Sequence, residues 1–200
     1  MTDDDEIKEN LRRYGEIKQQ IFKAFADVKL EDGIGFYKAG AIDDYLAPND
    51  PKYVEEKARD ERHDWTKVFA LLEDKENFDP ARSCFMDAKG LHFYMPILLL
   101  LSDSVAQDSV LMHGVIENRP ESIELMRRLT AAQKQSILDC LEDSVDYAGW
   151  IEFYTDYKGQ ECHCCGKIHH PESYTKEEAI AKIESRDEFI LLQFLKNHFM

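Results

Sequence analysis

Apolar residues near the start of the chain recur at steps of three or four positions, and this spacing constrains the fold more tightly than any other pattern in the sequence. Residues spaced in this way lie on one face of an α-helix, which has about 3.6 residues per turn. The acidic residues before them favour the N-terminal end of the helix dipole. The pattern predicts an amphipathic helix over residues 3–28. Its apolar face consists of Ile7, Leu11, Tyr14, Ile17, Ile21, Phe25 and Val28.

Residues that favour helix ends predict further helices. Asp50 before Pro51 predicts a helix that continues to about Arg62, because a carboxylate caps the first turn and proline is favoured at its first position. Pro96 predicts the start of a buried helix that continues to about Val105. The same kind of signal predicts helix starts at Asp64, at the capping boxes of Thr130 with Gln133 and Thr175 with Glu178, and at Asp187.

One short β-hairpin is predicted among these helices. Cys84–Met86 and Leu91–Tyr94 are short apolar segments on either side of Asp87–Gly90. A glycine near the end of such a connection is typical of a tight turn between two strands. We therefore expect a mostly α fold (α+β) with one small β-hairpin and a Cys/His-rich C-terminal extension.

The segment CHCCGKIHH is the densest group of potential metal ligands in the chain. Thiolates and imidazoles at this density suit a zinc ion, and the two thiols of a C-x-x-C pair can converge on it. A second C-x-x-C pair, which a full zinc ribbon has, is missing. The alternatives are an inert Cys-rich loop and a redox pair. The candidate ligands are Cys162, Cys164, Cys165, His169 and His170.

We expect this zinc to be structural, with Cys162, Cys165 and at least one of His169 and His170 as ligands. The fourth ligand can be the other histidine, Cys164 or a distant residue such as His198. This assigns residues 1–150 to a helical domain and residues 151–200 to a zinc-binding extension with two C-terminal helices.

The net charge of the chain indicates which classes of partner it can attract. The formal net charge is −15 and 44% of the residues are hydrophobic. Such a charge argues against nucleic acid and against an anionic membrane surface as partners, because both attract basic proteins. It would instead attract a basic protein.

Cysteine content and hydropathy predict the compartment. The chain has five cysteines, and its acidic N-terminus is unlike a secretory signal. The longest apolar run, Met95–Leu101, is far shorter than the roughly 20 residues that a spanning helix needs. We therefore expect a cytoplasmic protein. The sequence predicts no oligomeric state.

Three segments combine carboxylates with aromatic residues. They contain Asp43, Asp44, Asp60, Asp64 and Asp87. Carboxylates of this kind can cap helices and form turns, or they can form a metal or acid–base site. In the second case the chain would be a metal-dependent hydrolase, with His63 or His92 as a further site residue. No motif with a spacing diagnostic of catalysis is present.

These segments also carry a resemblance to a known family. The blocks AFADV, DGIG with AIDDY, DERHDW, FMDAKGLHFYMP and LTAAQKQSILDCLED resemble those of an uncharacterised family of small bacterial proteins with a domain of unknown function. The resemblance covers about residues 17–145. It implies a bacterial, cytosolic origin, and the family has no assigned catalytic residues that could be transferred to this chain.

We hypothesise that the chain is a non-enzymatic interaction protein, most concretely an immunity-type inhibitor that covers the basic active site of a bacterial toxin. The predicted partner contacts are Asp43, Asp44, Tyr45, Asp64 and Trp65. For Trp65 itself a position in the core is expected instead of a direct contact, because apolar residues continue its helix face. The alternatives are the metal-dependent hydrolase and a structural or regulatory domain stabilised by zinc.

Overall fold

Helices are the regular elements of the structure, a computed structural model that describes residues 3–73, 78–101, 119–144, 174–184 and 187–199. In chain order they are α1 (Asp3–Ala24), α2 (Phe36–Asp43), α3 (Pro51–Arg59), α4 (Trp65–Leu72), the 3-10 helix η2 (Pro80–Phe85), α5 (Ala88–Leu101), α8 (Pro120–Arg128), α9 (Ala131–Ser144), α11 (Lys176–Glu184) and α12 (Asp187–Phe199). The described ranges contain no β-strand. The mostly α fold is confirmed, and the predicted β-hairpin is wrong.

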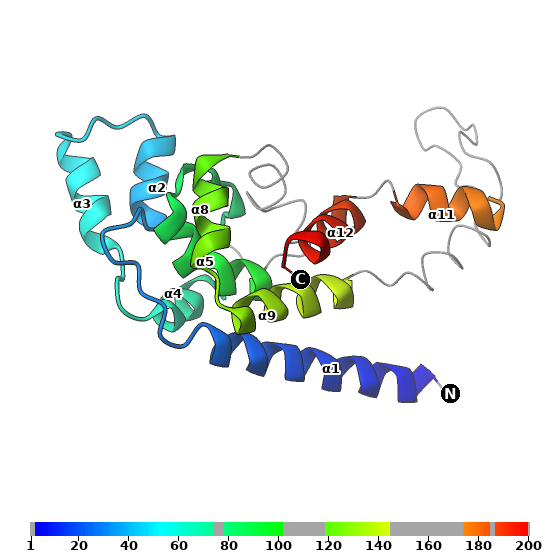
Figure 1. Ribbon diagram of the computed structural model, residues 1–200. Coiled ribbons are helices and arrows are strands. Elements are labelled where there is room, and N and C mark those ends of the chain that lie inside the picture. The colour runs from blue at the N-terminus through cyan, green and yellow to red at the C-terminus, as the bar shows by residue number, and fades with distance from the viewer. Residues whose placement is uncertain (1–2, 74–77, 102–118, 145–173, 185–186, 200) are drawn as a thin grey trace, which may run out of the picture.

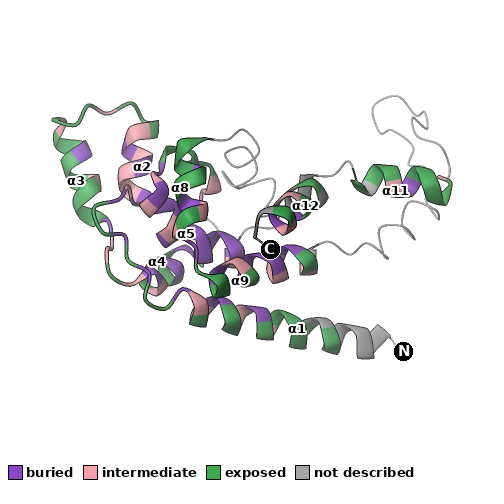
Figure 2. Ribbon diagram, in the orientation of Figure 1, coloured by how far each residue is buried: buried purple, intermediate pink, exposed green. Residues whose placement is uncertain are grey.

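Helix α5 is the centre of the fold. Nearly all of its residues are buried, and α1, α4, α8 and η2 pack around it. Figure 1 shows α9 between α1 and α12, and both of these helices contact α9. Figure 2 shows that the buried residues gather where these helices meet. A helix that is apolar on all sides must be covered on all sides, which explains this central position.

The first predicted helix is confirmed, although only part of its apolar face is buried. Ile17, Ile21 and Phe25 enter the core, whereas Leu11 is 67% exposed and Tyr14 is 49% exposed. The N-terminal turns of α1 run past the end of α9 in Figure 1. The described part of the chain therefore covers the second half of the apolar face and leaves the first half in contact with solvent.

The residues predicted as a hairpin form the end of η2 and the start of α5. The Asp87 carboxylate accepts a hydrogen bond from the N–H of Gly90 (2.8 Å), as an N-cap does. It also accepts one from the N–H of Ile34 (3.0 Å). The sequence alone favours a turn here because an aspartate with a glycine three positions later is common both to turns and to helix starts.

Gly90 is required by a close approach of two backbones. A Cβ atom at this position would lie 2.1 Å from the carbonyl oxygen of Ile34. Gly33 is constrained in the same contact, since its Cβ atom would lie 2.7 Å from Cβ of Lys89. The two glycines thus allow the loop before α2 to lie directly on the first turn of α5.

Most predicted helix caps are present. The Asp50 carboxylate caps α3 by accepting from the N–H of Lys52 (2.8 Å), and Asp64 caps α4 by accepting from the N–H of Thr66 (3.1 Å). Both capping boxes are also formed, Thr130 with Gln133 before α9 and Thr175 with Glu178 before α11. These signals involve residues close in sequence and therefore predict helix starts reliably.

Among the described residues, two α-helices and the 3-10 helix η2 were not predicted, and the start of another helix was placed wrongly. Helix α2 has Gly35 at its N-cap without a side-chain cap, and α8 has Pro120 at its first position after Arg119. Pro96 lies inside α5 instead of opening a helix. A proline in a helix interior leaves the carbonyl four residues earlier without its usual partner, so sequence rules place it at a helix start.

The C-terminal helix belongs to the same core as the preceding helices. Leu192 and Leu195 of α12 are buried in the hydrophobic cluster that contains Ile137 and Leu141 of α9. The predicted domain boundary at residue 150 lies outside the described residues. No helix within the described ranges is long and apolar enough to cross a membrane.

Candidate functional site

Asp60, at the end of α3, lies against the first turn of α2 and caps that helix. Its Oδ1 atom accepts a hydrogen bond from the N–H of Tyr37 (2.9 Å). Gly35 makes room for the carboxylate, because a Cβ atom there would lie 2.4 Å from Cγ of Asp60. The carboxylate therefore replaces the local cap that α2 lacks.

The Asp60 carboxylate is also desolvated. Burial raises its pKa, and its Oδ2 atom has no partner within the described structure. The hydroxyl of Tyr94 is buried without a described partner as well, and burial raises the pKa of Tyr94 well above its usual value. An unpaired polar atom in an apolar interior costs free energy, so this corner of the core holds unsatisfied polar groups.

The carboxylates considered for a hydrolase do not converge. Asp60, Asp64 and Asp87 bind the starts of three different helices, α2, α4 and α5. His63 is exposed, whereas His92 is half-buried beside Gln133 (3.1 Å), and burial lowers the pKa of His92. The described residues contain no group of three or more His, Cys, Asp or Glu that could hold a metal ion. Their arrangement therefore gives the hydrolase hypothesis no support.

Tyr45 occupies an unusual position at the end of α2. The N–H of Tyr45 donates to the carbonyl of Ile42 (3.0 Å), and the N–H of Leu46 donates to the carbonyl of Ala41 (3.0 Å). This pair of bonds is a Schellman motif, and it places Tyr45 in the left-handed region with φ 56°. Glycine is the usual residue there because a Cβ atom is crowded. Tyr45 is nevertheless 96% exposed, so it gains no packing in return.

Asp43 and Asp44 directly precede this tyrosine and are also exposed. Asp44 forms an ion pair with Lys52 of α3 (3.3 Å). We call the three consecutive residues Asp43, Asp44 and Tyr45 the Tyr45 ridge. The structure thus keeps three of the five predicted partner contacts together on the surface.

The other two predicted contacts lie away from the Tyr45 ridge. Asp64 is half-buried as the cap of α4. Trp65 is 1% exposed, and its Nε1 donates to the carbonyl of Phe25 (2.9 Å). Its ring also packs against Phe22, with ring centroids 5.0 Å apart. The expectation that Trp65 is a core residue is confirmed.

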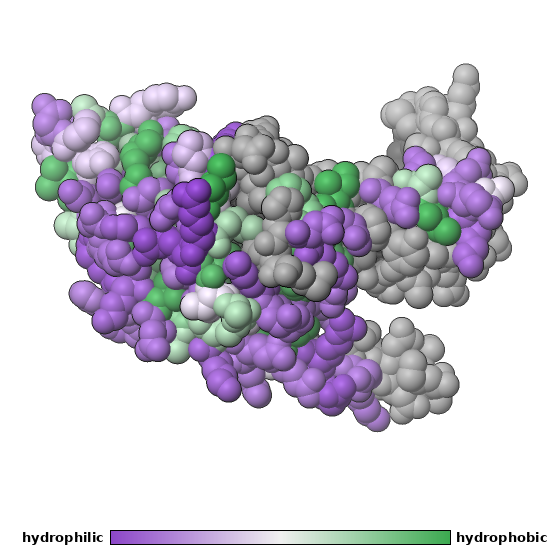
Figure 3. All heavy atoms as spheres, in the orientation of Figure 1, coloured by the Kyte–Doolittle hydropathy of each residue, from purple (hydrophilic) through white to green (hydrophobic). Residues whose placement is uncertain are grey.

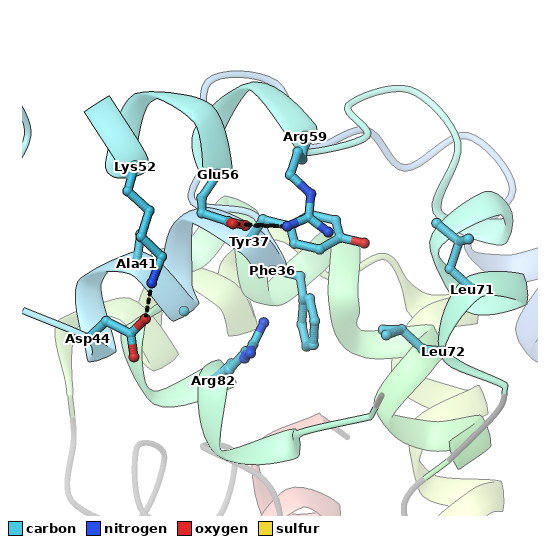
Figure 4. Close-up of a pocket in the computed structure, with 11 residues that line it drawn as sticks. Phe36, Tyr37, Ala41, Asp44, Lys52, Glu56, Arg59, Leu71, Leu72 and Arg82 are labelled. Atoms are coloured by element: carbon cyan, nitrogen blue, oxygen red, sulfur yellow. Dashed lines mark hydrogen bonds and ion pairs between the residues drawn. The ribbon is translucent and has the colours of Figure 1, made fainter. Parts of the chain in front are cut away.

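A pocket of about 410 Å³ lies beside α2, where this helix faces α3, α4 and η2. Figure 4 shows aromatic and charged side chains on its walls. The residues that give it its chemical character are Phe36, Tyr37, Lys52, Arg59, Leu71 and Arg82. Asp44 of the Tyr45 ridge also lines it, so the ridge and the pocket adjoin.

Two guanidinium groups lie on aromatic rings in this pocket. The guanidinium carbon of Arg59 is 3.9 Å from the ring centre of Tyr37, and that of Arg82 is 4.3 Å from the ring centre of Phe36. Gly40 lies close to Arg82, since a Cβ atom on Gly40 would be 3.0 Å from the guanidinium carbon. Stacking on the Phe36 ring holds the guanidinium of Arg82 in place, and the lack of a side chain at Gly40 leaves room for it.

The predicted site residues did not include the cations of this pocket. Its lining comes from four elements between positions 36 and 82, and no spacing rule relates them. Lys52 and Arg59 lie on α3, which was predicted, but α2 was missed. A local sequence signal could not have identified the pocket, because it forms only when these elements pack together.

The predicted zinc ligands, Cys162, Cys164, Cys165, His169 and His170, lie outside the described residues. Two other cysteines are described. Cys84 is exposed, and Cys140 is largely covered in α9, where burial raises its thiol pKa to about 12. A thiol with such a pKa stays protonated at neutral pH, which fits a small packing residue.

Residues 13–148 match the model of a family described as "Family of unknown function (DUF6714)". The chain belongs to this family. The predicted resemblance to an uncharacterised family over about residues 17–145 is therefore confirmed. No curated protein and no solved structure matches the chain. The DUF6714 region contains the pocket and the Tyr45 ridge, whereas α11 and α12 lie beyond it.

Proposed function

We propose that this DUF6714 protein is a non-enzymatic interaction protein that binds a basic protein partner through the Tyr45 ridge. The observation that carries the proposal is the exposed tyrosine at the left-handed end of α2. Local folding favours glycine at this position, and tyrosine makes no packing that would offset the strain. Contact with a partner would account for a tyrosine at this position.

The chemistry of the ridge fits an interface anchor. Tyrosine is enriched at the centre of protein interfaces, because its ring contributes a large contact area and its hydroxyl can form a hydrogen bond. Asp43 and Asp44 supply negative charge beside it. The net charge of −15 adds long-range attraction for a basic partner, and the face in Figure 3 is predominantly hydrophilic.

An immunity-type inhibitor of a bacterial toxin is the most concrete form of this proposal. Such an inhibitor would cover a basic active site with the carboxylates of Asp43 and Asp44 and insert Tyr45. In this proposal the protein acts in the cytoplasm, where cysteines stay reduced. The Cys/His segment would hold a structural zinc through Cys162, Cys165 and at least one of His169 and His170.

Site-specific photocrosslinking tests the proposal. A variant with p-benzoylphenylalanine in place of Tyr45 should crosslink in cells to one protein that is rich in lysine and arginine. The matched control carries the same group in place of Gln20, an exposed residue of α1. Crosslinking of the same proteins from both positions would contradict the proposal.

Binding of the purified partner then measures the role of each residue in the ridge. Tyr45→Gly should weaken binding about tenfold or more, as truncation of an interface anchor does. Its stability should stay unchanged or rise by up to about 1 kcal/mol, because the left-handed strain is removed. Asp43→Asn with Asp44→Asn should mainly slow association. Unchanged binding of the Tyr45→Gly variant would refute the proposal.

A further inference from the structure

The pocket beside the Tyr45 ridge has a chemistry that the proposed partner binding does not use. Lys52, Arg59 and Arg82 line it together with two carboxylates, those of Asp44 and Glu56. The charged residues of the lining thus sum to one positive charge, opposite in sign to the net charge of −15 of the chain. Its local field therefore favours an anion.

The two carboxylates of the pocket are already paired. Asp44 lies 3.3 Å from Nζ of Lys52, and Glu56 accepts from Nη1 of Arg59 at 2.7 Å. Arg82 differs, because its partner Asp79 lies at 3.4 Å from Nε and does not line the pocket. Within the described structure, the terminal nitrogens of Arg82 form no hydrogen bond with a carboxylate, and the ion pair with Asp79 is recorded at Nε.

Arg82 is also preorganised to bind an anion. Its guanidinium lies against the ring of Phe36 and above Gly40, so few alternative orientations are open to it. A planar guanidinium presents paired N–H donors that match a carboxylate or a phosphate. Holding the donor group in place before binding reduces the entropy cost of forming these bonds.

The remaining walls are apolar and aromatic. Leu71 is 61% exposed beside the pocket, and Leu72 lies deeper in the wall. The rings of Phe36 and Tyr37 stand roughly perpendicular to each other, with their centroids 5.6 Å apart. Figure 4 shows Arg82 and Phe36 side by side, with the leucines on the opposite side of Phe36. An apolar group of a ligand would lie against this side.

We infer that the pocket binds a small organic anion that carries a carboxylate or a phosphate next to a flat apolar group. The anionic group pairs with the terminal nitrogens of Arg82, and the apolar group packs against Leu71 and the aromatic wall. A volume of about 410 Å³ is in the range of pockets for small ligands. The inference is independent of the protein partner proposed above.

Titration of the full chain with model anions, followed by amide NMR, tests this inference. Benzoate represents the carboxylate and phenyl phosphate represents the phosphate, and the one that binds more tightly identifies the anionic group. Either anion should shift the amide signals of α2 and η2 at millimolar concentrations. Benzylamine, which has the same ring and the opposite charge, should leave these signals unchanged.

Variants separate the two parts of the site. Arg82→Gln should weaken the tighter anion about tenfold, the loss expected for a charge-assisted contact. Arg127→Gln is the control, because Arg127 is an exposed arginine of α8 paired with Glu124. Leu71→Gln alters a surface residue and should weaken phenyl phosphate while leaving inorganic phosphate unaffected.

The inference would be overturned by stronger shifts with benzylamine than with either anion, or by the absence of shifts with both anions. Unchanged binding by a folded Arg82→Gln variant would also overturn it. If the Arg82→Gln variant does not fold, the Leu71→Gln result decides. Equal losses for phenyl phosphate and inorganic phosphate would then refute the apolar subsite.

Discussion

Asp60 shows how a single residue can be essential to local structure and still be held at a cost. Its carboxylate replaces a local cap for α2 by binding the N–H of Tyr37. Burial desolvates the charge and raises its pKa, and Oδ2 has no described partner. Asp60 thus stabilises the start of α2, while its burial disfavours the charged form of its carboxyl group.

Substitutions of Asp60 should separate these two effects. The folded-state pKa is raised, so the contribution of Asp60 to stability is greatest below the unfolded pKa of about 4 and is lost as pH rises through the folded pKa. Asp60→Asn keeps an oxygen acceptor without the charge. The difference in free energy of unfolding between the Asp60→Asn variant and the original protein should therefore shift in favour of the variant as pH rises from about 4 to about 7.

Asp60→Ala removes the acceptor as well and should lower the free energy of unfolding by about 1–3 kcal/mol near pH 4, a loss that narrows as pH rises because the variant has no buried charge. Urea unfolding of the three proteins across this pH range measures both effects. An advantage of Asp60→Asn that shrinks as pH rises would show that attraction to the α2 N-terminus outweighs burial.

Two glycines decide how neighbouring elements fit together. Gly90 allows the carbonyl of Ile34 to lie against the first turn of α5, and Gly33 completes the contact from the other side. Asp87 then binds both segments, through the N–H of Ile34 and the N–H of Gly90. The start of α5 and the loop before α2 are thereby joined, and α2 carries the Tyr45 ridge and part of the pocket.

Glycine-to-alanine substitutions should have opposite effects at two helical positions. Gly90→Ala would place a Cβ atom 2.1 Å from a backbone oxygen and should cost about 1–3 kcal/mol or more. Gly15→Ala in α1 meets no atom within 4 Å and should stabilise the protein by about 0.5–1 kcal/mol, because alanine favours helix. Thermal unfolding compares the two. Equal effects would mean that the close approach is not maintained in solution.

At the scale of the whole molecule, the C-terminal part of the chain is tied to the DUF6714 region. Leu192 and Leu195 of α12 are buried against the core, and Lys196 forms an ion pair with Glu142 of α9 (2.7 Å). The proposed zinc ligands lie between α9 and α12 in sequence. A zinc site there would constrain the chain between α9 and α12 and so reduce the entropy cost of packing α12 against α9.

We expect about one zinc ion per chain, bound by the Cys/His segment. Cys162→Ser and Cys165→Ser should abolish zinc binding, whereas Cys84→Ser should retain it, because Cys84 is an exposed cysteine of η2. Elemental analysis of protein purified without an affinity tag measures the metal content. A metal content near zero, with every thiol freely titratable, would contradict the zinc prediction.

Features that depend on neighbouring residues were predictable from the sequence. The caps at Asp50 and Asp64, both capping boxes and the periodicity of α1 involve residues within a few positions of each other. Local hydrogen bonds and side-chain spacing act before the chain is compact, so they leave a readable pattern. The distinctive blocks of the DUF6714 region were recognisable for the same reason.

Features that depend on distant residues were decided by packing. Helix α2 is capped by Asp60, which lies 23 positions after Tyr37. The start of α5 was interpreted as a hairpin because the carbonyl that requires Gly90 belongs to Ile34. The pocket brings Arg82 onto Phe36 from a separate element. In each case the controlling contact forms only after the elements have packed, so no local pattern in the sequence can reveal it.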